Sequence, residues 1–392
     1  MLFVDDDVAV LKRLRRMLRS DRRNWDMEFA EGAAAGLGVL VQQPFDVVVA
    51  DFRMPGMNGG QFLNEVRHRY PDAARLILTE RPEPEDFINV VGLAHQVIEK
   101  SCSSDDLHDA LARAMSLRGR LGTQRIRAEV GEIGMLPTPS PVFSELMAAI
   151  DSPSGDARTV ANVINHDMGL TAKVLQLVNS SFFAPRSRVT SVEAAVVRLG
   201  REVIRTVAML DEIRKGFNAP RSVREWCVQL SPHGYEVAGL ARYLAAPKMK
   251  DDAFCAGLLH ECGQLAFARC RPELFGAHLD LRVETRRSLC DLEIEAFGAT
   301  HAQAGGYLLS LWGFPTEVVE AVALHDGDAA PGELARVVQV AHRVIEQTSH
   351  SMCDAPSYTR DMSWLVGHPY EAPVREWFTE SLTNEAVEVL AI

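Results

Sequence analysis

The sequence has no apolar run long enough to cross a membrane, and its few cysteines are scattered. No stretch of 18 or more apolar residues occurs among the 392 residues, so we expect no transmembrane helix. Only four apolar residues precede three aspartates at the amino terminus, which is too short for a secretory signal. The seven cysteines are odd in number and include no C-x-x-C pair. This usage argues against a disulfide framework or a cysteine zinc site and predicts a cytoplasmic protein.

The sequence also has fewer basic than acidic residues. The chain has 41 lysines and arginines against 53 aspartates and glutamates, which gives a formal net charge of −12. Nucleic-acid binding needs a basic surface to contact phosphates, so we expect no DNA partner. The length exceeds that of one typical core and predicts two or three domains.

The first 118 residues alternate short β-branched runs with amphipathic stretches of helix length. We predict strands at residues 2–4, 27–30, 46–50, 75–78 and 97–99. We predict helices at residues 8–19, 31–41, 59–70, 85–93 and 105–117. Such alternation is typical of an α/β fold, a doubly wound parallel five-stranded sheet with helices on both faces. Ligands of such sheets bind beyond the carboxyl ends of the strands.

The remaining sequence contains only helical signals. Asp167 stands where a helix N-cap belongs, and Thr190 with Glu193 has capping-box spacing before a helix predicted over 194–210. Prolines at 137, 139 and 141 exclude a helix interior there. We therefore expect a first domain at 1–118, a linker at 119–134, an all-α helical domain at 135–350, and a C-terminal extension at 351–392 packed on the helical domain.

Acidic residues stand at the ends of two predicted strands. Asp5 and Asp6 follow the first strand and Asp51 follows the third, so their carboxylates should converge at one edge of the sheet. Carboxylates that repel one another call for a cation, and an oxygen-only ligand set favours Mg²⁺. Thr79 follows the fourth strand and Lys100 the fifth. A carboxylate nucleophile, a cation, a hydroxyl and an ammonium suit phosphoryl transfer to Asp51. The alternative is that the acids only cap turns and helices.

This arrangement resembles the receiver domain of response regulators over residues 1 to about 118. The motifs are Phe-Val-Asp-Asp-Asp at 3–7 and Val-Ala-Asp-Phe-Arg-Met-Pro-Gly-Met-Asn-Gly at 49–59. The resemblance implies that Asp51 is the phosphoacceptor, served by a sensor histidine kinase. It implies that Asp5, Asp6, Asp51 and the Arg53 backbone carbonyl hold Mg²⁺. Thr79 and Lys100 become the switch residues that contact the phosphoryl group, and residues 85–117 the dimer or interdomain surface.

Three positions depart from the receiver pattern. Glu80 replaces the usual small residue after the threonine, Val97 replaces the aromatic switch residue, and Ser101 replaces the proline after the lysine. The phosphoryl chemistry should survive these changes. The coupling of phosphorylation to a change of the surface should be altered, because valine has no aromatic ring that could change its orientation. A second reading is therefore a constitutive scaffold with a degenerate receiver.

The second half carries sparse histidines and resembles an HDOD domain over residues 135 to about 350. The match rests on Leu-Pro-Thr-Pro at 136–139, Asn-His-Asp-Met-Gly-Leu-Thr-Ala-Lys at 165–173, Leu-Val-Asn-Ser-Ser-Phe-Phe at 177–183, Ala-Gly-Leu-Leu-His at 256–260 and Trp-Gly-Phe-Pro at 312–315. HDOD domains are relatives of HD phosphohydrolases that generally lack their activity. The resemblance implies a vestigial HD site comprising His233, His260, Glu261, His301, His325 and His342.

Departures from the HD enzymes lie at this site. Their His-Asp pair reads His260-Glu261 here, and their late aspartate is His342. A longer carboxylate and a replaced ligand should disturb catalytic geometry. We therefore expect no metal and no catalysis in the helical domain, which would instead bind a downstream signalling protein. The alternative is a receiver-gated, metal-dependent phosphohydrolase acting on cyclic dinucleotides or nucleotides.

Overall fold

The computed structural model describes most of the chain. The described residues are 1–80, 93–116, 124–131, 133, 141–151, 156–179, 188–201, 203–204, 208, 219–327, 332–348 and 363–385. The helix predicted at 85–93 falls outside these residues except for Leu93, as do the segment 134–140 and Cys353.

The first third forms the predicted parallel sheet. Its strands are β1 (Leu2–Asp5), β2 (Glu28–Glu31), β3 (Val47–Asp51), β4 (Ala74–Thr79) and β5 (Gln96–Glu99), in the order β2-β1-β3-β4-β5. Every neighbouring pair is parallel. Strands β1, β3 and β4 are buried along their whole length, which explains their continuous apolar runs. The fold class predicted from the sequence is confirmed, with strand ends within a residue or so of prediction.

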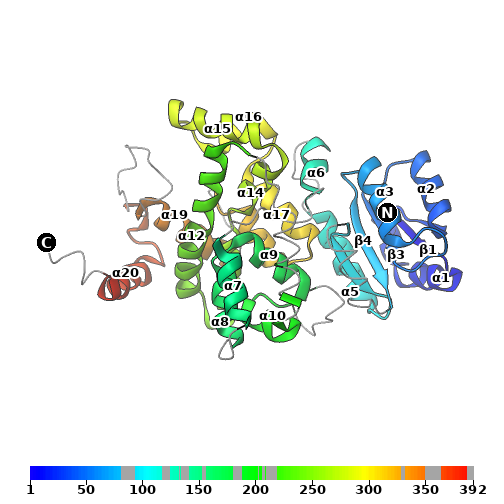
Figure 1. Cartoon of the computed structure of the whole chain (residues 1–392), viewed down its shortest axis with the longest axis horizontal. Helices are drawn as coiled ribbons and strands as arrows, with labels where there is room; N and C mark the ends of the chain where they lie inside the picture. Colours follow the sequence, from blue (N-terminus) through cyan, green and yellow to red (C-terminus); the bar gives the residue numbers. More distant parts are fainter. Residues whose placement is uncertain are drawn as a thin grey trace.

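Helices cover both faces of this sheet. They are α1 (Val8–Met17), α2 (Gly32–Gln42), α3 (Gly59–Arg69) and α5 (Ser104–Ser116). Buried side chains of α2 and α3 form one apolar cluster with one face of the sheet. Those of α1 and α5 join a second cluster on the other face, which continues into the rest of the molecule. Figure 1 shows this domain (blue to cyan) at one end of the chain's long axis.

The rest of the chain is helical, as predicted. The first helices are α6 (Gln124–Gly131), α7 (Pro141–Asp151), α8 (Ala157–Asn165), α9 (Met168–Val178), α10 (Val192–Leu199) and α12 (Arg221–Leu244). They are followed by α13 (Lys250–Leu259), α14 (Cys262–Cys270), α15 (Pro272–Thr285), α16 (Leu289–Phe297), α17 (His301–Leu311), α18 (Thr316–Ala323), α19 (Glu333–Thr348) and α20 (Glu371–Glu385). Short 3-10 turns occupy Asp21–Arg23, Pro247–Met249 and Ser363–Leu365.

Two local predictions about helix ends are corrected. Asp167 does cap α9, accepting a hydrogen bond from the Leu170 amide at 2.8 Å. The cap of α10, however, is Ser191 and not Thr190, whose hydroxyl donates instead to Asp252 at 2.8 Å. Helix α10 also ends at Leu199 rather than continuing unbroken to residue 210, although the described residues 201, 203, 204 and 208 are helical again. The reason is Gly200, whose φ of 79° lies outside the helical range.

The buried residue His233 belongs to a long helix. It lies in the middle of α12, a helix of 24 residues that continues through Pro232. Tertiary packing outweighs the cost of the proline, because much of α12 is buried against its neighbours. This placement points His233 into the centre of the helical domain.

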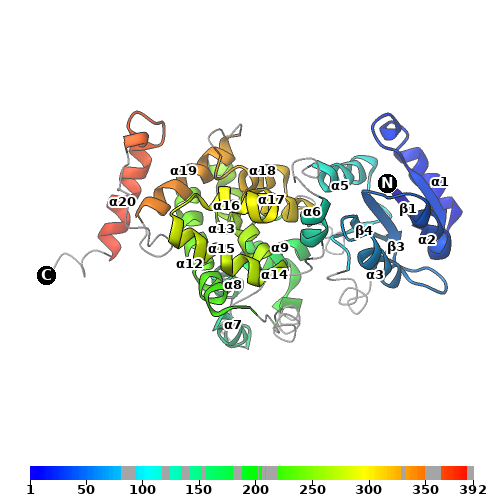
Figure 2. The same ribbon diagram turned by 90° about the horizontal axis from the view of Figure 1, so that it is seen from above.

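The two halves are joined by polar contacts as well as by the shared core. Gln96 in β5 donates to the Ser310 carbonyl of α17 at 3.4 Å, and the Ser310 hydroxyl donates to the Arg113 carbonyl of α5 at 2.9 Å. Gln176 of α9 donates to the His95 carbonyl at 3.1 Å. Figure 2 shows α5 and α6 between the sheet and the helical domain. The sheet therefore meets the helical domain through β5 and α5.

Helix α6 lies in the segment predicted as a linker and contacts both halves. The guanidinium of Arg75, a buried residue of β4, donates to the Gly131 carbonyl at 2.6 Å, and His95 bonds the same oxygen at 2.7 Å. On the other side, Glu129 forms a two-pronged ion pair with Arg271. Its Ile126 and Val130 belong to the large apolar cluster. The described part of the segment is thus an ordered helix.

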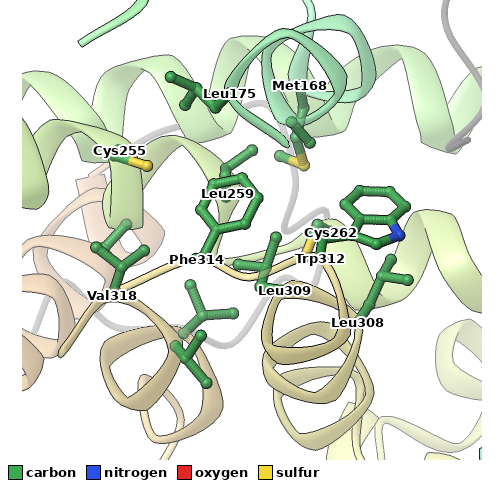
Figure 3. Packing of buried hydrophobic residues seen from close by; sticks show 14 of the residues in the cluster. Met168, Leu175, Cys255, Leu259, Cys262, Leu308, Leu309, Trp312, Phe314 and Val318 are labelled. Carbon is green, nitrogen blue, oxygen red and sulfur yellow. The ribbon is translucent and has the colours of Figure 1, made fainter. Parts of the chain in front are cut away.

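The helical domain has a dense apolar interior. Figure 3 shows Met168, Leu259, Cys262, Leu309 and Phe314 packed together from α9, α13, α14, α17 and the loop after it. Gly263 allows α14 and α17 to touch, because a Cβ there would stand 1.9 Å from the His301 carbonyl oxygen. This packing holds the residues around 260 and 301 in fixed positions.

Two further features complete the fold. Among the described residues, no helix is both long and apolar enough to span a bilayer. Helix α20 contacts α12, and Trp364 stacks under Arg343 of α19, so the described part of the predicted C-terminal extension touches the helical domain.

Candidate phosphoryl-acceptor site and buried histidine cluster

The predicted acidic residues meet at the carboxyl edge of the sheet. Asp5 and Asp51 are the last residues of β1 and β3, and Asp6 follows Asp5. Each offers a carboxylate oxygen, and the three oxygens lie within 4.8 Å of one another. An all-oxygen set of this size suits a hard divalent cation such as Mg²⁺, so the residues fit the ion that the sequence predicts.

Lys100 lies between two of these acids. Its Nζ is 2.8 Å from Asp5 Oδ2 and 3.1 Å from Asp51 Oδ1. The Lys100 amide donates to the Thr79 carbonyl at 2.8 Å, which ties the ends of β4 and β5 together. Thr79 ends β4 and is buried, one position beyond Leu78, the register partner of Asp51. The five predicted residues therefore stand at adjacent strand ends.

The charges in this site have clear physical causes. Burial raises the pKa of Asp51, whereas the Lys100 ammonium beside it and a backbone hydrogen bond with Arg53 lower it and offset part of the rise. Burial alone would lower the pKa of Lys100, but the hydrogen bond to Asp5 and the charge of Asp51 raise it overall. The lysine is thus held as a cation against the carboxylate pair.

The loop after β3 turns back closely over the buried Asp51. Gly59 is required where the loop returns, because a Cβ would stand 2.1 Å from the Asp51 carbonyl oxygen. Asn58 caps α3 through a capping box with Gln61. Between this loop and Asp6 lies an open hollow that Arg53 and Asn58 help to line.

The positions that depart from the receiver pattern lie in or directly after β4 and β5, the strands that lead to Thr79 and Lys100. Glu80 is exposed at the end of β4, and Ser101 hydrogen-bonds Glu99 at 2.8 Å. Val97 is partly buried against the cluster of α2 and α3. Its neighbour in β5, Gln96, is the residue that bonds Ser310 of the helical domain.

The histidines and the glutamate predicted for the second site converge, although they lie far apart in the sequence. They come from α12, the α13–α14 junction, the start of α17, the residues after α18, and α19. All six are buried: His233, His260, Glu261, His301, His325 and His342. The rings of His233, His260 and His342 have centroids 4.8–5.6 Å apart. Glu261 and His342, which stand where HD enzymes have aspartates, therefore still lie in the cluster.

Two acids of the cluster were not predicted. Asp326 Oδ2 is 3.0 Å from His301 Nε2, and its Oδ1 is 3.4 Å from His342 Nδ1. The His325-Asp326 pair was the only sequence signal for it. Glu293 of α16 accepts from the His301 amide at 2.8 Å and lies 2.7 Å from its Nδ1. No sequence pattern indicated Glu293.

Electrostatics in the cluster separate one histidine from the others. Burial lowers the pKa of His233 and of His342 to about 4, and burial with neighbouring histidines lowers that of His260 well below its usual range. His301 differs, because Glu293, Glu261 and Asp326 overcome the effect of burial and raise its pKa well above the usual range. These carboxylates therefore favour the protonated, cationic form of His301.

Comparison with known proteins agrees with this description. The family model of the response regulator receiver domain matches residues 1–112, and that of the HDOD domain matches residues 136–327. The hydrogenase transcriptional regulatory protein HoxA of Cupriavidus necator is 36% identical over 124 residues, 31% of this chain and 25% of that protein. An uncharacterized protein of Treponema pallidum is 22% identical over 61% of this chain and 47% of its own length.

Solved structures show likeness over part of the chain. The MmoQ response regulator of Methylococcus capsulatus is 24% identical with a TM-score of 0.47, covering 56% of this chain and 90% of that one. An HDOD domain protein of Geobacter sulfurreducens is 21% identical with a TM-score of 0.38, covering 72% and 97%. The chain spans at most about half of the two curated relatives above.

The two family matches coincide with the two halves described here. Receiver domains accept phosphate from histidine kinases, so this combination supports phosphorylation-controlled signalling. The chain therefore belongs to the response regulators, with an N-terminal receiver domain followed by an HDOD domain.

Proposed function

We propose that this protein is a phosphorylation-controlled switch in which Asp51 accepts a phosphoryl group and the receiver regulates the HDOD domain. The observation that carries the proposal is the position of Lys100, whose ammonium contacts both Asp5 and Asp51 beside the third acid, Asp6. A carboxylate cluster with a fixed ammonium at strand ends is built for phosphoryl transfer.

In this proposal an Asp51 carboxylate oxygen attacks the phosphorus of a phosphohistidine on a partner sensor kinase. The new P–O bond forms as the P–N bond breaks, and the imidazole leaves with the electron pair. Asp5, Asp6, Asp51 and the Arg53 carbonyl would hold Mg²⁺, which offsets phosphoryl charge. Lys100 moves from the carboxylates to a phosphoryl oxygen, and Thr79 donates to another.

Intact-mass measurement with acetyl phosphate and Mg²⁺ tests the acceptor. We expect the mass of one phosphoryl group on the wild-type chain and none on Asp51→Asn. The matched control is Asp7→Asn, because Asp7 belongs to the same acidic run but caps α1, a role that asparagine fills equally well. Labelling that persists in Asp51→Asn and disappears in Asp7→Asn would refute the assignment.

The contacts of β5 support control of the HDOD domain. Gln96 and Lys100 stand four residues apart, so movement of the lysine toward a phosphoryl group acts on the strand that bonds Ser310. The HDOD domain would then change its contact with a downstream protein or a second copy. The free thiols among the described residues fit the cytoplasmic location that belongs to this proposal.

Hydrogen exchange with beryllofluoride and Mg²⁺ tests the coupling. We expect faster or slower exchange of amides at the end of α17 when the phosphoryl mimic binds, and no change in Asp51→Asn. Binding without any change in α17 would favour the constitutive scaffold instead.

The histidine cluster favours one second candidate, hydrolysis of phosphodiesters gated by the receiver. Its support is the convergence of histidine and carboxylate ligands in the HDOD domain. Turnover of cyclic dinucleotides by the metal-supplemented chain tests it, with loss expected in His325→Gln. Absence of turnover above that of the variant would exclude this activity.

A further inference from the structure

The centre of the HDOD domain contains the largest group of metal-binding side chains in the described part of the chain. His233, His260, Glu261 and His342 offer ligand atoms that all lie within 4.8 Å of one another. All four residues are buried. They come from α12, the α13–α14 junction and α19, three elements that pack against one another.

We propose that His233, His260, Glu261 and His342 bind a divalent transition-metal ion of the zinc, iron or manganese class. The proposal goes beyond the signalling function and does not depend on turnover. It also departs from the sequence-based expectation that this domain holds no metal.

The orientation of the imidazoles supports ligation. The Nδ1 of His260 is 2.6 Å from the Gly257 carbonyl oxygen, and the Nδ1 of His325 is 2.7 Å from the Val322 oxygen. A carbonyl only accepts, so these Nδ1 atoms carry the protons and the Nε2 lone pairs are left to face the cluster. Histidine ligands of metals are held in this way by their other ring nitrogen.

His301 is also held by its Nδ1 atom, but the partner is a carboxylate rather than a backbone carbonyl. Its Nδ1 lies 2.7 Å from the Glu293 carboxylate, and its Nε2 points at Glu261 Oε2 at 3.2 Å. A carboxylate behind an imidazole fixes the ring and raises its basicity as a ligand.

Two buried nitrogen atoms in the cluster have no hydrogen-bond partner. They are Nδ1 of His233 and Nε2 of His260, in side chains that are 2% and 0% exposed. A buried polar atom without a partner is destabilising, and native proteins rarely leave two in one place. A cation between the rings would satisfy the His260 nitrogen directly and draw the His233 nitrogen to it.

The donor atoms determine the class of ion. Three imidazoles and one carboxylate form a nitrogen-rich set, which suits zinc and its neighbours and binds Mg²⁺ poorly. The receiver site is the opposite, because it offers oxygen atoms only. The two halves of this chain should therefore select different ions.

A second set of possible ligand atoms adjoins the first set through Glu261. Its Oε1 faces His260 Nε2 at 3.7 Å and His342 Nε2 at 3.8 Å, whereas its Oε2 faces His301. Asp326 lies on that side with 24% of its side chain exposed, so the cluster reaches the surface there. This edge gives an ion a path into an otherwise buried site.

Metal content of the full-length chain tests the proposal. Protein purified without chelator and held in excess Mg²⁺, which saturates the receiver, should contain about one transition ion per chain by mass spectrometry. Co²⁺ added after chelation should give visible d–d absorption. Zn²⁺ at a hundredfold excess over its Kd should raise the Tm of the helical domain by roughly 5–10 °C.

Matched variants separate ligation from folding. His260→Gln should lose the Co²⁺ absorption and the Zn²⁺-dependent Tm rise while keeping the helical circular dichroism. His166→Gln is the control, because His166 is an exposed histidine outside the cluster and should leave both signals intact. Asp51→Asn should also retain them, so failure of the phosphorylation proposal would not affect this result. Less than about one tenth of an ion per chain with no Co²⁺ absorption, or absorption unchanged in His260→Gln, would overturn the proposal.

Discussion

Gly313 provides a direct test of the contact between the receiver and the HDOD domain. It follows α17 with a φ of +78°, and the Phe314 amide bonds the Leu309 carbonyl at 3.1 Å around it. A Cβ at Gly313 would stand 2.9 Å from Oε1 of Gln96, the β5 side chain that donates to Ser310. Gly313→Ala therefore strains the backbone and displaces an interdomain side chain at the same time.

The two effects have separable magnitudes. A left-handed backbone costs an alanine about 1–2 kcal/mol relative to glycine. Displacement of Gln96 removes a hydrogen bond, which adds roughly 0.5–1.5 kcal/mol. Gly367 has the same φ of +78°, but a Cβ there would meet nothing within 4 Å. Gly367→Ala should therefore lower the free energy of unfolding only by the cost of placing alanine in a left-handed backbone.

Urea unfolding followed by tryptophan fluorescence measures both variants, and the buried Trp312 beside Gly313 contributes to that signal. A double-mutant cycle with Gln96→Ala isolates the contact. The variant with both Gly313→Ala and Gln96→Ala should lose roughly 0.5–1.5 kcal/mol less unfolding free energy than the sum of the losses of its two single variants. For Gly367→Ala combined with Gln96→Ala, the two losses should be additive. Equal losses in Gly313→Ala and Gly367→Ala, with additivity in both cycles, would refute the interface.

Three further predictions concern the helix α6 and the acceptor. Burial lowers the folded-state pKa of His95 well below 6.5, so the stability supplied by its neutral ring is full above about pH 6.5 and is lost on acidification below it. Hydrogen exchange of α6 should accelerate in that range, and His95→Gln should abolish the pH dependence. Arg271→Met should cost about 1–2 kcal/mol in urea unfolding by breaking its partly buried pair with Glu129, whereas Arg287→Met on the surface should cost less than about 0.5 kcal/mol. Burial raises the pKa of the acceptor carboxyl, so initial labelling rates with acetyl phosphate should fall as the buffer is acidified toward that pKa, and a flat profile would contradict this.

Local sequence patterns were sufficient to predict the sheet and the acidic residues at its edge. Runs of β-branched residues recur at the spacing of alternating strands and helices, and the carboxyl ends of parallel strands share one edge. The positions of Asp5, Asp51 and Lys100 follow from that rule alone, and the structure places them within contact distance.

Helix ends and the linker were less predictable. Ser191 and Thr190 are both good caps, and only the contact of Thr190 with Asp252 selects between them. The ordered helix α6 depends on Arg75 and Arg271, which lie 56 residues before Gly131 and 142 residues after Glu129 in the sequence. No local propensity records partners so distant.

The sequence by itself determined the two-domain order, the parallel sheet and the cluster of acidic residues at its edge, because each depends on periodicity or on residues at strand ends. Only the tertiary structure decided that histidines spread from 233 to 342 surround one point, and that Asp326 and Glu293 join them. Side chains from α12, the α13–α14 junction, α16, α17, the residues after α18, and α19 must pack together before they meet. Likewise, the contact of Gln96 with Ser310 spans 214 residues and exists only when the two domains dock.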